Sequence, residues 1–442
     1  MTMPEVTNNC AAALAAVRSD RIADAENILT DLIEGNFGLQ VSSLKVNRDQ
    51  FSLNSVNGFV TVGDGRSFFF KFHHEEGEEH TLEELYRGEV LNQVGYPVDV
   101  PAYAEQRVGR QILLYNMRHD RRFFDICLEH DFDQDVQELS PILDAQRALD
   151  RQSLEIYLRT LHPADDQKVR AEAIHQLFFY RLADPGDSGR PSSLGGRARR
   201  FFYGREFRFP GLTLSANELR AAHWVINGVP YKDSIEALFQ RSLRRLSPES
   251  LSRFGAVTAH GDAHNANVWW LAEPPPPHLV FFDPAFAGAE IPALMAEIKA
   301  TFHNIFAHPL WLYHPDRAAE NFSARVRYED GTIYVDTDWQ LSPLRQAFLG
   351  IKEKALWMPL LHAMRQKDIL PSDWLETMRC ALFCCPTLVM DLCAGGASGH
   401  NEISSIIGLS AAIMVGSAPK SSIVPVDAPA AFLGRLEAAF SN

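Results

Sequence analysis

Apolar residues recur with a helical period at the start of the chain and cluster as in β-strands soon after it. Between residues 8 and 34 they return every three or four positions, and Gly35 follows where such a helix would end. The next apolar segments are short, rich in β-branched and aromatic residues, and separated by glycine-containing turns, which is typical of strands. These predicted strands cover residues 39–41, 59–62 and 68–72.

A helix is expected after these strands, followed by a second pair of strands. Residues 81–94 come after an acidic run and end just before Gly95, as a helix would. Residues 104–108 and 111–114 have the composition of strands, with a turn at Gly109 between them. The order of three strands, one helix and two strands predicts a small antiparallel sheet that carries one helix.

Beyond this sheet the pattern is mainly helical. Periodic segments cover residues 144–161, 172–184 and 232–246, and helices are expected to dominate after residue 283. The chain is therefore predicted to have an α+β fold in two lobes, with a helical extension before them. The expected boundaries are 1–36 for the extension, 37–117 for the small lobe and 118–442 for the large helical lobe.

Composition narrows the class of protein. At 442 residues and 46% hydrophobic content the chain can bury more than one core, while a net charge of −14 argues against a general nucleic-acid or anionic-membrane binder. No signal peptide and no apolar stretch of about 20 residues is evident in the sequence. The six cysteines lack zinc-site spacing and are expected to be buried thiols in a reducing compartment. We therefore expect a cytoplasmic protein, and the sequence does not indicate its oligomeric state.

The residues with the clearest chemistry lie between positions 260 and 283. The sequence His-Gly-Asp places Asp262 in a turn, and Asn267 follows five residues later. A short apolar segment then ends at Asp283. Magnesium prefers oxygen ligands and shares them with phosphate oxygens, so one acid and one amide suit a phosphate-bound metal. The second acid can then accept the proton of an attacking hydroxyl, as in the catalytic loop of kinases.

This stretch resembles the aminoglycoside phosphotransferase and choline kinase family, which has a protein-kinase-like fold. Family members carry a His-Gly-Asp-x-x-x-x-Asn loop, here residues 260–267, and a strand that ends in Asp-Pro or Asp-x-Gly, here within residues 281–288. The resemblance implies that Asp262 is the catalytic base and that Asn267 and Asp283 are the magnesium ligands. It also implies ATP as the second substrate, in a cleft between two lobes.

The resemblance predicts further residues in the small lobe. A lysine that contacts phosphates belongs on the third strand, and Lys71 lies there among phenylalanines. Its partner in the family is a glutamate of the next helix, for which Glu89 is the best match, with Glu83 and Glu84 as alternatives.

The resemblance also implies where the rest of the nucleotide is held. Residues 52–58, with Ser55 and Asn57, would cover the phosphates, although a plain hairpin turn is an alternative for this segment. Asn116 and Met117 would present backbone groups to the adenine ring.

These features predict an ATP- and Mg²⁺-dependent kinase that phosphorylates a hydroxyl of a small molecule. The acceptor could be an aminoglycoside, an amino alcohol, a sugar or an amino acid derivative. Two alternatives are a non-catalytic nucleotide-binding scaffold of the same fold and transfer of a nucleotidyl group. The acidic balance favours a cationic acceptor, whereas the arginine-rich stretch 190–208 could either contact a phosphorylated or carboxylated substrate or be a mobile insertion. Nearby histidines at 303, 308 and 314 have poor spacing for a metal site.

Overall fold

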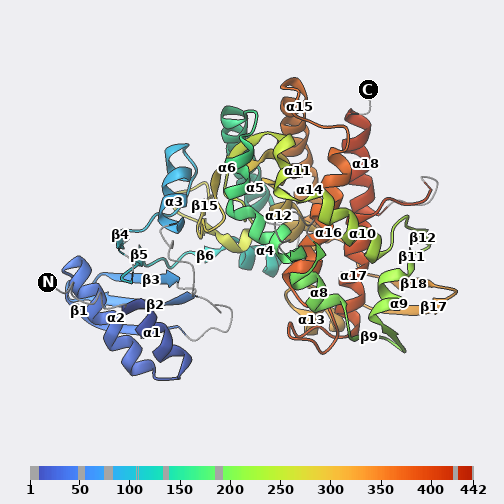
Figure 1. Cartoon of the computed structure of the whole chain (residues 1–442). Coiled ribbons are helices and arrows are strands. Elements are labelled where there is room, and N and C mark those ends of the chain that lie inside the picture. Colours follow the sequence, from blue (N-terminus) through green and yellow to red (C-terminus); the bar gives the residue numbers. More distant parts are fainter. Residues whose placement is uncertain are drawn as a thin grey trace. The chain divides into compact units, whose positions relative to one another are not determined.

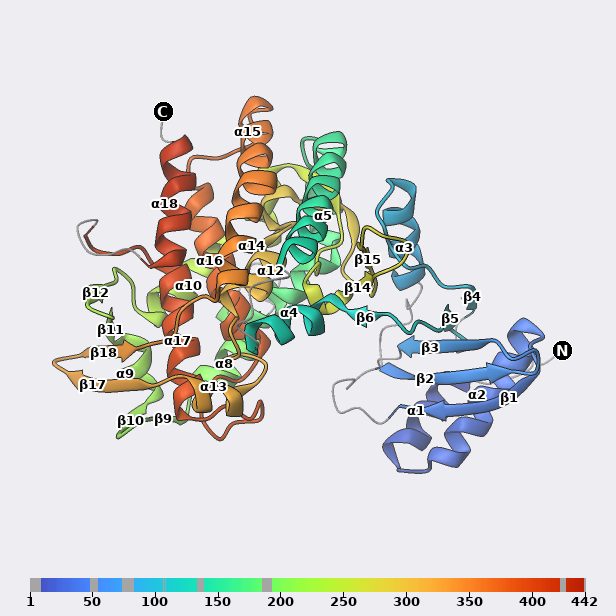
Figure 2. The ribbon, with the colours of Figure 1, turned by 180° about the vertical axis from the view of Figure 1, so that it is seen from behind.

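The chain forms two compact units in the computed structural model (Figures 1 and 2). The model describes residues 9–47, 55–73, 83–105, 107, 109–132, 139–184, 193–421 and 427–440. The first unit comprises Met1–Gln93, Pro97–Asp120 and Phe282–Ala285, and the second comprises Val94–Tyr96, Arg121–Phe281 and Phe286–Asn442. The segment with Asp283 thus belongs to the first unit, although it follows a strand of the second.

The first unit is built on a five-stranded antiparallel sheet in the order β1-β2-β3-β5-β4 (Figure 1). Its strands are β1 (Val41–Val46), β2 (Ser55–Val62), β3 (Ser67–His73), β4 (Tyr103–Glu105) and β5 (Ile112–Asn116). A single helix, α3 (Glu83–Gln93), lies between β3 and β4 in the sequence. This is the predicted order of elements, and the α+β fold class is confirmed.

Two helices, not one, precede the sheet. They are α1 (Asn9–Arg18) and α2 (Ile22–Phe37), and the chain turns between them at Asp20, which has a left-handed φ of 56°. The second helix passes Gly35 and ends at Gly38, whose left-handed φ of 64° suits glycine. Buried leucines of α2 share one core with the phenylalanines of β3, so the helices are part of the first unit and not a separate extension.

The second unit is mostly helical. Its longest helices are α5 (Leu139–Thr160), α16 (Trp374–Val389) and α17 (Glu402–Gly416), of which α16 and α17 pack against each other and are almost wholly buried (Figure 2). The others are α4 (Phe123–Phe132), α6 (Asp166–Ala171), α7 (Phe179–Leu182), α8 (Gly196–Phe202), α9 (Ala216–Ala221), α10 (Ile235–Arg245), α11 (Pro248–Leu251), α12 (Ile298–Thr301), α13 (Pro315–Asn321), α14 (Pro343–Lys352), α15 (Met358–Gln366) and α18 (Ala428–Phe440). None of the helices in the described ranges is both long and apolar enough to cross a lipid bilayer.

The second unit also contains short strands, most of which the sequence pattern did not indicate. A four-stranded sheet in the order β12-β11-β18-β17 combines β11 (His223–Ile226) and β12 (Val229–Pro230) with β17 (Ala324–Glu329) and β18 (Thr332–Thr337). Two further hairpins are formed by β7 (Ala183–Asp184) with β8 (Ser193–Leu194) and by β9 (Glu206–Phe209) with β10 (Leu212–Ser215). The strands around residue 262 are β13 (Ala256–Ala259), β14 (Val268–Leu271), β15 (His278–Phe281) and β16 (Gly288–Pro292), with β6 (Arg121–Arg122) pairing to β14.

A buried ionic cluster ties together three parts of the helical unit. The ammonium group of Lys352 on α14 pairs with Asp150 on α5, and its Nζ lies 3.0 Å from Oε2 of Glu297, just before α12. The Tyr157 hydroxyl donates to the other oxygen of Glu297 over 2.6 Å. Burial raises the pKa of the Asp150 carboxyl to about 6, although Lys352 opposes that rise. One ammonium therefore serves two carboxylates in a site without solvent.

We expect this cluster to make stability depend on pH. The pKa of Asp150 is higher in the folded chain than its usual value of about 3.9, so the folded state binds the proton more tightly in the range between them. The contribution of this group to stability is present below about pH 4 and is lost as the pH rises towards about 6. Asp150→Asn removes the titration. Urea unfolding measures the difference in free energy of unfolding between wild type and this variant, and the relative stability of wild type should fall from pH 4.5 to pH 7. An equal difference at the two pH values would contradict the raised pKa of Asp150.

Candidate active site

The loop that carries Asp262 is shaped by the glycine before it. Gly261 has a left-handed φ of 76°, and a Cβ atom placed on it would lie 2.3 Å from the carbonyl oxygen of Phe286. Only glycine fits both the dihedral angle and this close approach. The preceding His260 is fully buried, with its ring centroid 5.2 Å from that of Phe281 on β15. The chain therefore leaves β13 by a fixed turn that presents Asp262.

Gly261→Ala should be more disruptive than the same change at Gly331. Gly331 has a similar φ of 74°, but a Cβ atom there would meet nothing within 4 Å. Both variants carry the strain of alanine in a left-handed conformation, of about 1–2 kcal/mol, and only Gly261→Ala must also move the backbone at Phe286. Chemical unfolding measures the free energy of unfolding of the two variants. Equal losses of stability would show that the backbone at Phe286 moves away from residue 261 without an energetic cost.

Backbone and amide hydrogen bonds hold the loop as one rigid piece. The carbonyl oxygen of Asp262 accepts from the N–H of His264 over 2.9 Å and from Nδ2 of Asn267 over 3.0 Å. Further along, the N–H of Asn265 donates to Oδ1 of Asn304 over 2.8 Å. The structure thus brings Asp262 and Asn267 together as predicted. Because Asn267 uses its nitrogen within the loop, its Oδ1 is the atom suited to a metal ion.

The carboxylate of Asp262 is buried and faces cationic groups. Its Oδ1 lies 3.3 Å from Nζ of Lys299 and 3.6 Å from Nε2 of His264. Burial opposes ionisation, but the charge of Lys299, followed by those of His264, His260 and Arg181, holds the pKa of Asp262 below its usual value. Asp262 is therefore an anion at neutral pH. In this state its carboxylate can accept a hydrogen bond from a hydroxyl group.

Lys299, His303 and Asn304 belong to the site and were not predicted from the sequence. Lys299 lies on α12, which continues into a single π-helical turn, η6 (Phe302–Phe306). Turns of this kind are frequent at functional sites. The ring of His303 lies 5.6 Å from that of His264, and its Nδ1 shares a hydrogen bond with the hydroxyl of Tyr313. Burial lowers the pKa of His303 well below its usual value, so this ring is neutral.

The first unit holds Lys71 and Asp283, the predicted phosphate-contacting lysine and one predicted magnesium ligand. Nζ of Lys71, on β3, lies 2.7 Å from Oδ1 of Asp283. Asp283 has a left-handed φ of 54°, which is rare for a residue other than glycine and is a feature that clusters at functional sites. The predicted pairing of Lys71 with Glu89 is wrong, because Glu89 is exposed on α3 and has no ion pair within the described residues. The side chains of the alternatives, Glu83 and Glu84, lie outside those that the structure describes.

The predicted phosphate-covering loop is described only in part, so its role stays a prediction. Residues 52–54 lie outside the described part of the chain, and Ser55 and Asn57 belong to strand β2, where Asn57 pairs with Lys71 across the ladder. Asn116 ends β5 opposite Phe68, and the N–H of Met117 donates to the carbonyl oxygen of Ser67 over 3.0 Å. That amide is used by the sheet and is not a donor for an adenine ring.

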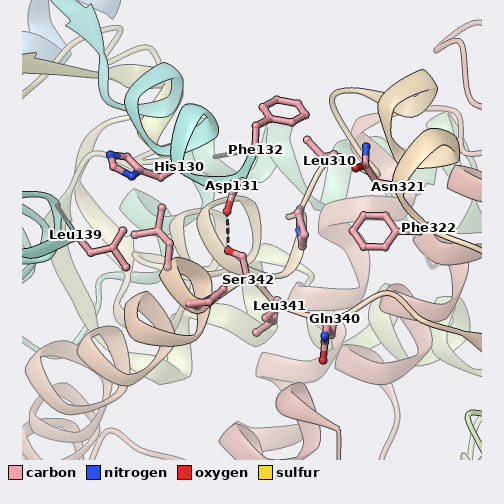
Figure 3. A pocket seen from close by; sticks show the side chains of 13 residues that line it. His130, Asp131, Phe132, Leu139, Leu310, Asn321, Phe322, Gln340, Leu341 and Ser342 are labelled. Carbon is pink, nitrogen blue, oxygen red and sulfur yellow. Dashed lines mark hydrogen bonds between the residues drawn. The ribbon is translucent and has the colours of Figure 1, made fainter. Parts of the chain in front are cut away.

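A buried ion pair contacts Asn304, which in turn accepts a hydrogen bond from the loop of residues 260–267. Arg345 and Asp131 have fully buried side chains, and Nη2 of Arg345 lies 2.6 Å from Oδ2 of Asp131. Another nitrogen of Arg345 donates to the carbonyl oxygen of Asn304, the residue that accepts from Asn265 in the loop. Asp131 also lines a cavity of about 430 Å³, where it accepts a hydrogen bond from Ser342 (Figure 3). The two residues fix the position of Asn304 relative to the loop.

Comparison with known proteins gives distant structural similarities only. No family model matches the chain, and no curated protein matches it significantly. Among solved structures, a type I macrolide 2'-phosphotransferase matches at 14% identity and a TM-score of 0.38, over 88% of this chain and 96% of that one. The macrolide 2'-phosphotransferase MphH from Brachybacterium faecium matches at 13% and 0.36, over 82% and 97%. A candidate fructosamine-3-kinase from Thermobifida fusca YX-ER1 matches at 12% and 0.35, over 86% and 98%.

These three proteins are small-molecule phosphotransferases or kinases by name, which is the class that the sequence resemblance suggests. TM-scores below 0.5 are too low to assign an activity to this chain. The function of this chain must therefore be inferred from its own residues.

Proposed function

We propose that this protein transfers the γ-phosphoryl group of ATP to a hydroxyl of a small molecule. The observation that carries the proposal is the loop of residues 260–267. There a buried, ionised Asp262 is fixed by Gly261 and by the amide of Asn267, and it lies 3.3 Å from Lys299. A carboxylate of this kind can orient an attacking hydroxyl, whereas a merely structural aspartate would be expected to have its oxygens bonded to the backbone.

In the proposed reaction the bond between the γ-phosphorus and the bridging β-oxygen breaks, and a bond from the acceptor oxygen to phosphorus forms. Asp262 accepts the hydroxyl proton, and ADP leaves. The charge on Lys299 keeps Asp262 ionised and confines its carboxylate to one orientation. Loose phosphoryl-transfer transition states need orientation more than a strong base, so a low pKa suits this role.

The residues of the first unit suit a nucleotide with its metal. Lys71 offers an ammonium group to phosphate oxygens, while Asp283 is a hard carboxylate ligand with a partly exposed side chain. We propose Asn267 and Asp283 as magnesium ligands on the basis of this donor chemistry. Bound magnesium would neutralise charge on the phosphates.

The Lys71–Asp283 ion pair also predicts competition. Magnesium and Lys71 require the same carboxylate, so metal binding should loosen the ion pair and free Lys71 for phosphate oxygens.

Asp283→Asn should raise the magnesium concentration needed for ATP turnover by about tenfold or more, because a neutral amide is a weaker ligand than a carboxylate. The measurement is a magnesium titration of ADP formation at fixed ATP. Asp31→Asn, at an exposed position of α2, is the matched control and should behave as wild type. An unchanged magnesium requirement in Asp283→Asn would contradict this ligand assignment.

Nucleotidyl transfer and a non-catalytic scaffold remain the alternatives. A nucleotidyl transferase would release pyrophosphate and attach AMP to the acceptor, and a scaffold would bind ATP without turnover. Assays for ADP and pyrophosphate in the same reaction therefore separate the three functions.

A further inference from the structure

A cavity of about 430 Å³ lies in the helical unit, between the end of α4 and the beginning of α14 (Figure 3). Most of its described wall is apolar and includes Leu139, Leu310, Phe322 and Leu344. Sites for small molecules are also mainly apolar, and their volumes are typically about 300–1,000 Å³. None of the described residues that were predicted for phosphoryl transfer lines this cavity. It is therefore a second binding site to consider, apart from the loop of residues 260–267.

The wall of the cavity offers no free charge to a ligand. The carboxylate of Asp131 is fully buried and is paired with Arg345, whose Nη2 lies 2.6 Å from its Oδ2. The hydroxyl of Ser342 donates to Oδ1 of Asp131 over 2.6 Å. The described part of the wall contains no other aspartate, no glutamate, no lysine and no arginine. A charged ligand would therefore lose water without gaining a counter-charge, whereas an uncharged ligand does not bear this cost.

Three further polar side chains line the cavity and can bind one uncharged polar group. His130 is half-buried, while Asn321 and Gln340 are exposed. Nδ2 of Asn321 donates to the carbonyl oxygen of Arg317 over 2.7 Å, so its Oδ1 is the atom suited to accept from a ligand. An apolar wall with a few polar groups at its more exposed side suits a molecule with an apolar body and one hydroxyl or amide.

Hydrogen bonds connect this wall to the loop that carries the proposed catalytic base. Asp131 binds Arg345, and Nη1 of Arg345 donates to the carbonyl oxygen of Asn304 over 2.8 Å. Oδ1 of Asn304 in turn accepts from the N–H of Asn265 over 2.8 Å. These contacts form a continuous path from the cavity to the loop within the helical unit. A ligand that holds the wall at Asp131 in place is therefore expected to make local opening of the loop less frequent.

We propose that the cavity binds an uncharged, mainly apolar small molecule with one hydrogen-bonding group, and that its binding restricts the loop of residues 260–267. The binding site and its link to the loop do not depend on the phosphoryl-transfer chemistry proposed above. Their tests therefore need neither ATP nor magnesium.

Four probes of similar size test the class of ligand: 4-phenylbutanol, anionic phenylbutyrate, cationic phenylbutylamine and the polar molecule sorbitol. Binding to the full chain is measured by calorimetry. We expect phenylbutanol to bind about tenfold or more tightly than either charged probe, because burying an unpaired charge is unfavourable, and sorbitol not to bind. Absence of phenylbutanol binding would overturn the proposed site. Equal affinity for a charged probe or for sorbitol would overturn the proposed class of ligand.

Variants assign the binding to this cavity. Leu139→Trp, at the start of α5, puts a larger side chain in the wall and should weaken phenylbutanol binding by about tenfold or more. Leu158→Trp makes the same change at an exposed position of the same helix and should bind like wild type. Phe322→Ala removes an aromatic contact from the wall and should also weaken binding, so the result does not depend on the folding of one variant. Wild-type affinity in either cavity variant would overturn the site.

Hydrogen exchange of backbone amides tests the link to the loop. With phenylbutanol bound, exchange in residues 260–267 should slow several-fold, because the opening that exposes the N–H of Asn265 becomes less frequent. The hairpin of β9 and β10 lies outside the hydrogen-bond path and should exchange at an unchanged rate. Unchanged exchange in the loop, or equal slowing in the hairpin, would overturn the link.

Discussion

Asp262→Asn is expected to lower the rate of phosphoryl transfer by about 10²–10⁴-fold, the usual contribution of a positioned general base. The amide has nearly the same shape as the carboxylate but cannot accept the proton of the hydroxyl. It also leaves the charge of Lys299 without its partner at 3.3 Å, so the orientation of residue 262 is expected to loosen. Binding of ATP should be largely retained, because the proposed phosphate and metal contacts come mainly from Lys71 and Asp283.

The measurement is the initial rate of ADP formation with saturating ATP and magnesium, together with the stabilisation of the folded chain by a non-hydrolysable ATP analogue. Asp336→Asn makes the same chemical change at an exposed position of β18 and should leave both quantities unchanged. If Asp262→Asn kept a rate near that of wild type, Asp262 would not be the base. If it lost stabilisation by the analogue as well, the loss of rate would reflect binding or folding instead.

Lys352→Met is expected to destabilise the chain by about 3–5 kcal/mol, the cost of leaving buried charges without their partner. Lys352 is the ammonium that neutralises Asp150 and Glu297, and all three side chains are at most 5% exposed. The variant leaves two carboxylates close together in a site that water does not reach. One of them must then take up a proton or the helices α5 and α14 must separate. A loss of this size is a large part of the stability of a typical domain.

Lys354→Met is the matched control, since Lys354 is exposed two residues further along the chain and should tolerate the change within about 0.5 kcal/mol. Adding Asp150→Asn to Lys352→Met should recover part of the stability, because one of the unpaired charges is removed. Urea unfolding of the two single variants and the double variant measures these effects. Equal stability of Lys352→Met and Lys354→Met would mean that the cluster is hydrated or that it rearranges freely.

The parts of the site that were predicted from the sequence depend on short spacing and on strand order. Asp262 and Asn267 lie in one loop, so their proximity follows from five residues of chain, and the structure brings them together. Lys71 was identified by its place on the third strand, which is where the sheet has it. Such local features can be predicted without knowledge of the tertiary fold.

Features that depend on packing were not predicted. Lys299 lies in an apolar segment far along the chain from Asp262, and only the course of α12 brings it to 3.3 Å. The resemblance to the family assigned Glu89 as the partner of Lys71, but the orientation of α3 leaves Glu89 exposed. Sequence spacing does not determine which face of a helix meets a sheet.

The central claim is that this chain transfers the γ-phosphoryl group and does so through Asp262. It is tested most directly with ATP labelled at the γ-phosphate or, in parallel, at the α-phosphate, supplied with magnesium and a mixture of hydroxylated small molecules. We predict that wild type places the γ-label on a small-molecule product and releases ADP, that the α-label stays in ADP, and that Asp262→Asn forms almost no product. Appearance of the α-label in the product, or equal product from wild type and Asp262→Asn, would contradict the assignment.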